Sequence, residues 1–177
     1  MRVPILVLAI ALASAAQPAA RKAIGPADSK THKTHVHGIA KLSVALDSPT
    51  TGAVDFESAA HAIVGFEYEA KSAADKKKVE VALATVRKRF IEMLILPRDR
   101  ACALTPTNVA LERDGSHSEV HGEFKLTCAQ SLGGVELRFG FYRVFPGIEQ
   151  VEVQLISDKQ QSSTIIKRDK GTVAIAP

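Results

Sequence analysis

The sequence predicts an α+β domain, with a mostly antiparallel β-sheet and one main inserted α-helix. Apolar and polar residues alternate along most of the chain after residue 35, which is typical of half-buried strands. Between Ser72 and Pro97 the apolar residues instead recur every three or four positions, as they do along one side of a helix. One helical segment inserted among many alternating segments indicates this fold class.

The first two strands are predicted to form a hairpin. Residues 36–46 place their apolar side chains on one face, and His35 and His37 belong to the opposite face. The sequence Ser-Pro-Thr-Thr-Gly at residues 48–52 predicts a turn, and a second alternating strand follows at residues 54–58. The polar positions of this second strand are Asp55 and Glu57.

The predicted helix begins near Ser72, because Asp75 three residues later completes a pattern similar to a capping box. Pro97 prevents the helix from extending much further. One apolar stripe of this helix should face the core. The stripe consists of Val79, Leu83, Val86 and Phe90.

The rest of the chain is again predicted to be β-structure. Asp114-Gly115 is a strong signal for a hairpin turn between strands at residues 108–113 and 119–128. Beyond this hairpin the alternation predicts further strands and one final pairing. The strands are residues 135–141, ended by Phe145-Pro146-Gly147, and residues 151–155, and the final pairing involves residues 165–166 and 173–175.

The first residues have the plan of a signal peptide. Residues 1–16 combine a positive start, an apolar run and small residues suited to cleavage. The apolar run is shorter than the roughly 20 residues that a membrane span needs, although an uncleaved anchor is the alternative. Residues 17–34 are predicted to be a flexible tail and residues 35–177 a single domain. With no second hydrophobic stretch, we expect export without stable membrane insertion.

Charge and cysteine content narrow the function further. The net charge of +4 comes from Lys and Arg scattered among acids, with no basic run interleaved with aromatics, so nucleic acid is not an expected partner. In an exported chain the two cysteines, Cys102 and Cys128, favour a disulfide worth about 3–4 kcal/mol. Thiolate metal binding is the alternative, which an oxidising compartment disfavours.

The six histidines are unevenly distributed, and their spacing limits what each can bind. His35 and His37 lie two apart on one face of a strand, about 6.5–7 Å from each other, so both can reach one zinc ion. His117 and His121 are about 13 Å apart along a straight strand and share an ion only if the chain curls. Otherwise His121 pairs with Glu119 on the same face.

These histidines avoid the apolar face of their strands. If the two strands are neighbours, an open site of imidazole and carboxylate ligands forms between them, which suits zinc, with copper or nickel as competitors. The alternative is that these side chains are simply polar surface. His32 and His61 are additional candidate ligands, although His61 lies among apolar residues, which is more typical of a hydrogen-bonded structural histidine. The chain has no His-Glu-x-x-His helix, nucleophile elbow or phosphate loop, so we expect no enzyme.

Four segments, in this order and spacing, resemble the ZrgA type of zinc-regulated periplasmic zinc-binding proteins. The resemblance covers the chain from about His35 to Ile175. The segments are His35-Val36-His37-Gly38-Ile39-Ala40-Lys41-Leu42, Val64-Gly65-Phe66-Glu67, His117-Ser118-Glu119-Val120-His121-Gly122-Glu123-Phe124 leading to Cys128, and Phe145-Pro146-Gly147-Ile148-Glu149 with Val151-Glu152-Val153-Gln154.

The resemblance implies a zinc-binding protein of the periplasm, made when zinc is scarce and acting beside an importer of the ABC type. By position, His35, His37, His117 and His121 are the implied metal-site histidines. The resemblance also implies the disulfide between the two cysteines.

This chain departs from its relatives at two positions. Related chains often carry a long His-rich stretch where this one has residues 113–116, so we do not expect storage of many ions. Many also have histidine after Gly-Phe-Glu, where this chain has Tyr68, although Glu67 is retained as a candidate ligand.

Two functions are therefore considered. The first is zinc acquisition or buffering in the periplasm, which requires neutral imidazoles, so affinity should fall as the pH drops through about 6.5. The second is a periplasmic interaction module that docks a partner through a strand edge or an apolar patch, with incidental histidines.

Overall fold

The computed structural model describes residues 38–115 and 117–177. The predicted signal peptide, the predicted tail and the candidate ligands His32, His35 and His37 lie outside the described residues. Everything below concerns the described part of the chain.

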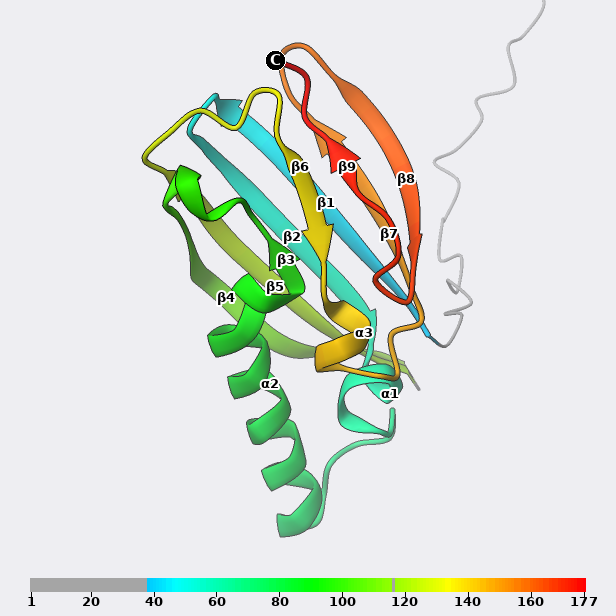
Figure 1. Cartoon of the computed structure of the whole chain (residues 1–177). Helices are drawn as coiled ribbons and strands as arrows, with labels where there is room; N and C mark the ends of the chain where they lie inside the picture. Colours follow the sequence, from blue (N-terminus) through cyan, green and yellow to red (C-terminus); the bar gives the residue numbers. More distant parts are fainter. Residues whose placement is uncertain (1–37, 116) are drawn as a thin grey trace, which may run out of the picture. The chain divides into compact units, whose positions relative to one another are not determined.

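Six strands form one large mixed sheet with the order β4-β5-β2-β1-β7-β8 (Figure 1). All neighbouring pairs are antiparallel except β1 and β7, which run parallel. The sheet therefore confirms a mostly antiparallel arrangement, with one parallel pairing that the alternation pattern does not reveal. The strands are β1 (Ile39–Ser48), β2 (Thr51–Ala59), β4 (Cys102–Asp114), β5 (His117–Cys128), β7 (Gln150–Ile156) and β8 (Gln161–Lys167).

The remaining elements include the main helix and a second, three-stranded sheet with the order β3-β6-β9. They are α1 (Ala60–Val64), α2 (Ala73–Met93), β3 (Leu94–Ile95), the 3-10 turn η1 (Arg98–Arg100), β6 (Glu136–Phe139), α3 (Phe141–Val144) and β9 (Val173–Ala174). The fold class is thus α+β, as the sequence predicts. No helix within the described ranges is long and apolar enough to span a membrane.

Helix α2 begins where the sequence predicts. The backbone N–H of Asp75 donates to the Ser72 hydroxyl, and that hydroxyl donates to the Asp75 carboxylate at 2.7 Å. Of the predicted stripe, Val86 and Phe90 lie in the core, whereas the other two residues are half-buried. The helix ends at Met93, before Pro97.

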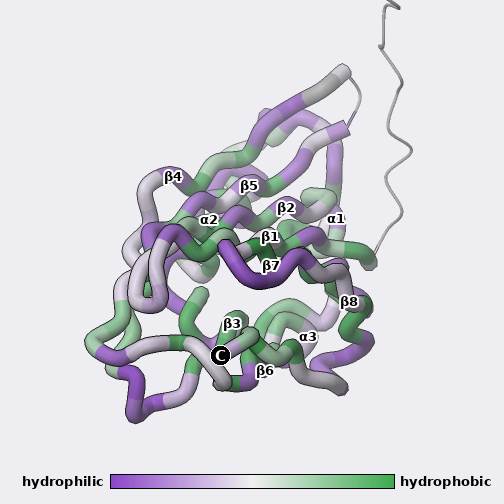
Figure 2. The backbone as a smooth tube through the Cα atoms, turned by 90° about the horizontal axis from the view of Figure 1, so that it is seen from above, coloured by the Kyte–Doolittle hydropathy of each residue, from purple (hydrophilic) through white to green (hydrophobic). Residues whose placement is uncertain are grey.

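The core lies between one face of the large sheet and a layer formed by α2, α3 and the small sheet. Figure 2 shows the strands of the large sheet on one side and β3, β6 and α3 on the other. The Phe90 ring of α2 stacks on Phe124 of β5 with ring centroids 3.8 Å apart, and it meets Phe56 and Phe141 edge to face. The inward face of β5 is thereby fixed against the helix, which directs its alternate residues to the opposite, open face.

Gly122 shows how closely β5 is packed. A side chain at this position would place its Cβ about 3.0 Å from the Phe124 ring and 3.6 Å from the Phe56 ring. Glycine therefore leaves room for both rings under the strand. Because side chains alternate along a strand, the neighbouring His121 side chain points to the opposite, open face.

Two predictions on the C-terminal half are wrong. Phe141 is not in a strand, because β6 ends at Phe139 and Phe141 begins α3, where it packs among the core aromatics. The last two apolar segments do not form one pairing together. Instead β8 pairs with β7, and β9 pairs with β6 in the small sheet.

Cys102 and Cys128 form a disulfide at the open end of the β4–β5 hairpin, as predicted. With a sequence separation of 26, loss of this link should lower the free energy of unfolding by about 3.5 kcal/mol on the chain-entropy model. We expect this loss in the Cys102→Ser/Cys128→Ser variant, measured by urea denaturation. A variant as stable as the oxidised wild type would contradict the prediction, and wild type measured with reductant is the matched control.

Candidate metal centre

A row of polar residues crosses the open face of the large sheet. In this row His121 of β5 lies directly opposite Glu57 of β2, and Glu57 lies directly opposite Lys41 of β1. Glu152 of β7 continues the row next to Lys41. Each of these residues alternates with a core residue along its strand, so the inward packing sets their outward direction.

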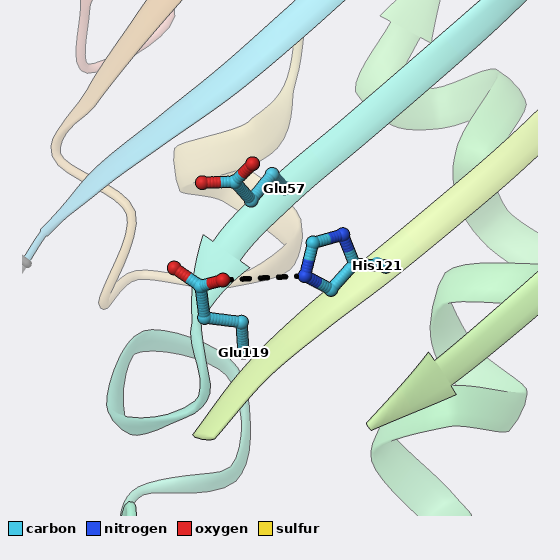
Figure 3. Close-up of side chains that lie close together, drawn as sticks. All are labelled: Glu57, Glu119 and His121. Carbon is cyan, nitrogen blue, oxygen red and sulfur yellow. Dashed lines mark hydrogen bonds and ion pairs between the residues drawn. The ribbon is translucent and has the colours of Figure 1, made fainter. Parts of the chain in front are cut away.

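Glu57, Glu119 and His121 gather their ligand atoms at one point of this face. The atoms that each residue offers lie within 4.8 Å of one another. Figure 3 shows the Glu119 carboxylate turned toward the His121 ring, with Glu57 on the neighbouring strand. The distance from His121 Nε2 to Glu119 Oε2 is 3.3 Å. These side chains are only 17–28% exposed, so the cluster is partly shielded from water.

This donor set fits a divalent metal. Zinc takes imidazole nitrogen and carboxylate oxygen at about 2.0–2.2 Å, which puts tetrahedral ligand atoms about 3.4 Å apart. The His121–Glu119 distance already meets this value, and Glu57 has to approach by at most about 1.4 Å to meet it. A mixed nitrogen and oxygen set suits zinc without excluding other first-row ions.

Glu112 of β4 adds a further carboxylate at the edge of the cluster. Its Oε2 lies 3.8 Å from His121 Nε2, and its side chain is more than half exposed. Glu112 is also directly opposite Glu119 in the β4–β5 pairing. Two like charges facing each other across strands destabilise a sheet, so a bound cation would relieve this repulsion.

Lys41 supplies a positive charge on the other side of the cluster. Its Nζ donates to Glu57 Oε1 at 2.7 Å. This hydrogen bond raises the pKa of Lys41 above its usual range, while partial burial opposes the increase. The negative charges of Glu57, Glu119 and Glu152 add to it. Lys41 is therefore firmly cationic at neutral pH.

The cluster opens into a hollow of about 420 Å³ on the open face. Its lining includes His121 and Lys41 together with five carboxylate residues. These five are Asp55, Glu57, Glu112, Glu123 and Glu152. The hollow is thus strongly acidic although the whole chain carries a formal charge of +4.

His117 lies in a different environment from His121. Its Nδ1 is 3.1 Å from Glu67 Oε2, and the neighbouring Ser118 hydroxyl donates to the Glu67 carbonyl at 2.9 Å. From His117 to Glu123, strand β5 pairs with β4 without a register shift, so the chain does not curl between His117 and His121. The structure therefore brings His121 to Glu119, and it brings the predicted candidate Glu67 to His117.

The strand order and the position of His61 bear on the remaining candidate ligands. The sequence hypothesis requires the first strand and the strand that carries His121 to be neighbours, and this condition is not met, because β2 lies between β1 and β5. His61 is exposed on α1. Gly38, the first described residue, has a positive φ of 82° and its carbonyl accepts from the N–H groups of Glu149 and Gln150.

Sequence reasoning missed Glu57 and Glu112 as candidate ligands. Both occupy outward positions of alternating strands, which is visible in the sequence. Their approach to His121 depends on which strands are neighbours and in which register, and the alternation pattern carries no such information. The signal that could have revealed them is an acidic residue at the outward position of a predicted strand.

No match was found among curated proteins. A model of the ZrgA family, described as a zinc uptake protein family, matches residues 34–175, which is most of the chain and the whole of both sheets. The chain therefore belongs to the ZrgA family of zinc uptake proteins.

Proposed function

We propose that this protein binds zinc at Glu57, Glu119 and His121 as part of zinc uptake. The single observation that carries the proposal is the convergence of two carboxylates and one imidazole within 4.8 Å on the open sheet face. Membership of a zinc uptake family supports zinc as the ion. In this proposal zinc is the cargo, and the protein serves acquisition or buffering.

The N-terminal histidines are proposed to complete the coordination. A structural or transport zinc site commonly has four ligands, and the described cluster offers three. His37 directly precedes Gly38, and His35 is two residues further, so both lie within about 12 Å of the described chain. Strand β1, which begins at Ile39, carries Lys41 next to Glu57, so this part of the chain enters the sheet beside the cluster. His117 with Glu67 is proposed as a second nitrogen and oxygen pair.

The proposed location is the periplasm, after removal of residues 1–16. The disulfide supports an oxidising compartment, because such bonds are rare where thiols are kept reduced. The proposed partner is a zinc importer of the ABC type, which the family resemblance implies. Residues 35–177 are proposed to be the zinc-binding domain.

The proposal is tested by calorimetric titration of the metal-free mature chain with zinc at neutral pH. We expect saturable binding, and we expect Glu57→Gln to weaken it at least about 10-fold, the smallest usual effect of changing even an outer-shell partner. Glu136→Gln is the matched control, because Glu136 is an exposed carboxylate of the small sheet. Absence of zinc binding, or equal affinities for Glu57→Gln and Glu136→Gln, would exclude the proposed site.

The contribution of the N-terminal histidines is measured in the same titration with His35→Ala/His37→Ala. We expect weaker binding, because two neutral imidazoles are lost from the coordination. Unchanged affinity would confine the site to the carboxylates and the histidine of the sheet.

A further inference from the structure

We propose that Lys41 is a built-in competing cation, which holds the Glu57 carboxylate in the metal-free protein and moves toward Glu152 when zinc binds. This inference rests on the proposed zinc site and names the residue that sets its affinity. Lys41 is not a ligand in this proposal. It acts on the metal through the charge and the hydrogen bond that it gives to Glu57.

The position of Lys41 between two carboxylates is the first observation. In the sheet register Lys41 is directly opposite Glu57 on β2 and directly opposite Glu152 on β7. Directly opposite residues have Cβ atoms about 4.5–5.5 Å apart, so a lysine side chain can reach either neighbour. In the structure its Nζ is 2.7 Å from Glu57 Oε1.

The charge of the surroundings is the second observation. The carboxylates of Glu57, Glu119 and Glu152 all act on Lys41 electrostatically, and among the described residues Lys41 is the only Lys or Arg that lines the acidic hollow. A cation at this point reduces the mutual repulsion of these acids before any metal arrives. The same cation repels a zinc ion that uses the same carboxylates.

Zinc binding and the Lys41–Glu57 contact therefore compete. A carboxylate oxygen that accepts a short hydrogen bond from an ammonium group has less electron density to offer a metal. The Lys41 side chain is about half exposed, so its ammonium group can turn away without breaking the core. Glu152 offers a second acceptor on the far side, which keeps the displaced charge paired. Because the Lys41 ammonium group can replace zinc at Glu57, the bound zinc stays exchangeable. Delivery of zinc to another protein requires such exchange.

Zinc titration of Lys41→Met tests this role, with Lys125→Met as the matched control. Lys125 is on the same open face but four residues from His121 along β5, about 13 Å away. Both substitutions remove one positive charge, so the control measures the general effect of charge on affinity. We expect Lys41→Met to bind zinc about 10-fold more tightly than Lys125→Met, and Lys41→Arg to stay within about 3-fold of wild type. Equal affinities for the two methionine variants would overturn the inference.

Thermal unfolding with and without zinc separates competition from a purely structural role. Without zinc, we expect Lys41→Met to unfold at a lower temperature than wild type. On saturation with zinc, we expect its unfolding temperature to rise by more than that of wild type. If the unfolding temperature of Lys41→Met is lower than that of wild type by the same amount with and without zinc, Lys41 has only a structural role and the inference is overturned. Lys41→Gln, which keeps a polar side chain, repeats the comparison if the methionine variant folds poorly.

The movement toward Glu152 has its own test. Glu152→Gln should weaken zinc binding in the wild-type background but have a markedly smaller effect in the Lys41→Met background. Equal effects in both backgrounds would overturn the proposed movement. If wild type itself binds no zinc, the proposed function fails with the inference, whereas wild-type binding with no effect of Lys41→Met overturns the role of Lys41 alone.

Discussion

Replacing His121 with alanine is expected to lower the zinc affinity at least about 100-fold. His121 supplies the single nitrogen donor of the cluster among the described residues, and it lies 3.3 Å from Glu119. Loss of even an outer-shell partner of a metal ligand typically costs about 10–100-fold in affinity, so loss of the ligand itself should cost at least the upper value. The change also leaves Glu57, Glu119 and Glu112 facing one another without an imidazole between them.

The measurement is a competition titration against a fluorescent zinc chelator, which resolves affinities too tight for calorimetry. Thr127→Ala is the control, because Thr127 is on the same strand and face of β5, about 20 Å from His121. His117→Ala distinguishes one site from two, since His117 lies beside Glu67 and not in the cluster. Near wild-type affinity of His121→Ala would show that zinc binds elsewhere on the chain.

Phe90→Ala is expected to lower the free energy of unfolding by about 3–5 kcal/mol, the usual cost of removing a buried phenylalanine. Phe90 is 1% exposed and its ring contacts Phe56, Phe124 and Phe141. Its loss leaves a cavity between α2 and the inward face of β5. Phe124 on that face belongs to the same strand as His121. We therefore also expect weaker zinc binding under conditions in which the variant is partly unfolded.

Ile91→Ala is the control for this change. Ile91 is the next residue of α2 but is 43% exposed, and surface substitutions usually stay within about 0.5 kcal/mol. Urea denaturation of both variants, with the disulfide intact, gives the comparison. Equal losses of stability would mean that the α2–β5 contact does not organise the core.

Local patterns predict most of the elements. The hairpins at residues 48–52 and after Asp114, the start of α2 at Ser72 and the strand at residues 151–155 all depend on neighbouring residues, and the structure confirms them. Phe141 shows the limit of such patterns. It continues the alternation of β6, but Gly140 precedes it and Asp169, far along the chain, accepts the N–H groups of Tyr142 and Arg143 and so begins a helix turn.

The candidate site shows the same limit more sharply. The sequence pairs Glu119 with His121 because the two are neighbours on one strand. The approach of Glu57 depends on β2 lying beside β5, and that of Glu112 depends on the register of β4. Such pairings between distant segments follow from the packing of the whole core, and alternation in a single sequence is compatible with several strand orders.

The parallel pairing of β1 with β7 has a consequence for the order of folding. Ile39 pairs with Gln150, so the middle of the large sheet joins segments from opposite ends of the domain. During synthesis from the N-terminus, the β1–β2 hairpin can form early. Strand β1 can pair with β7, its second neighbour, only after most of the domain has been made. We therefore expect the acidic hollow to be assembled late, with Glu57 in place well before Glu152 arrives beside Lys41.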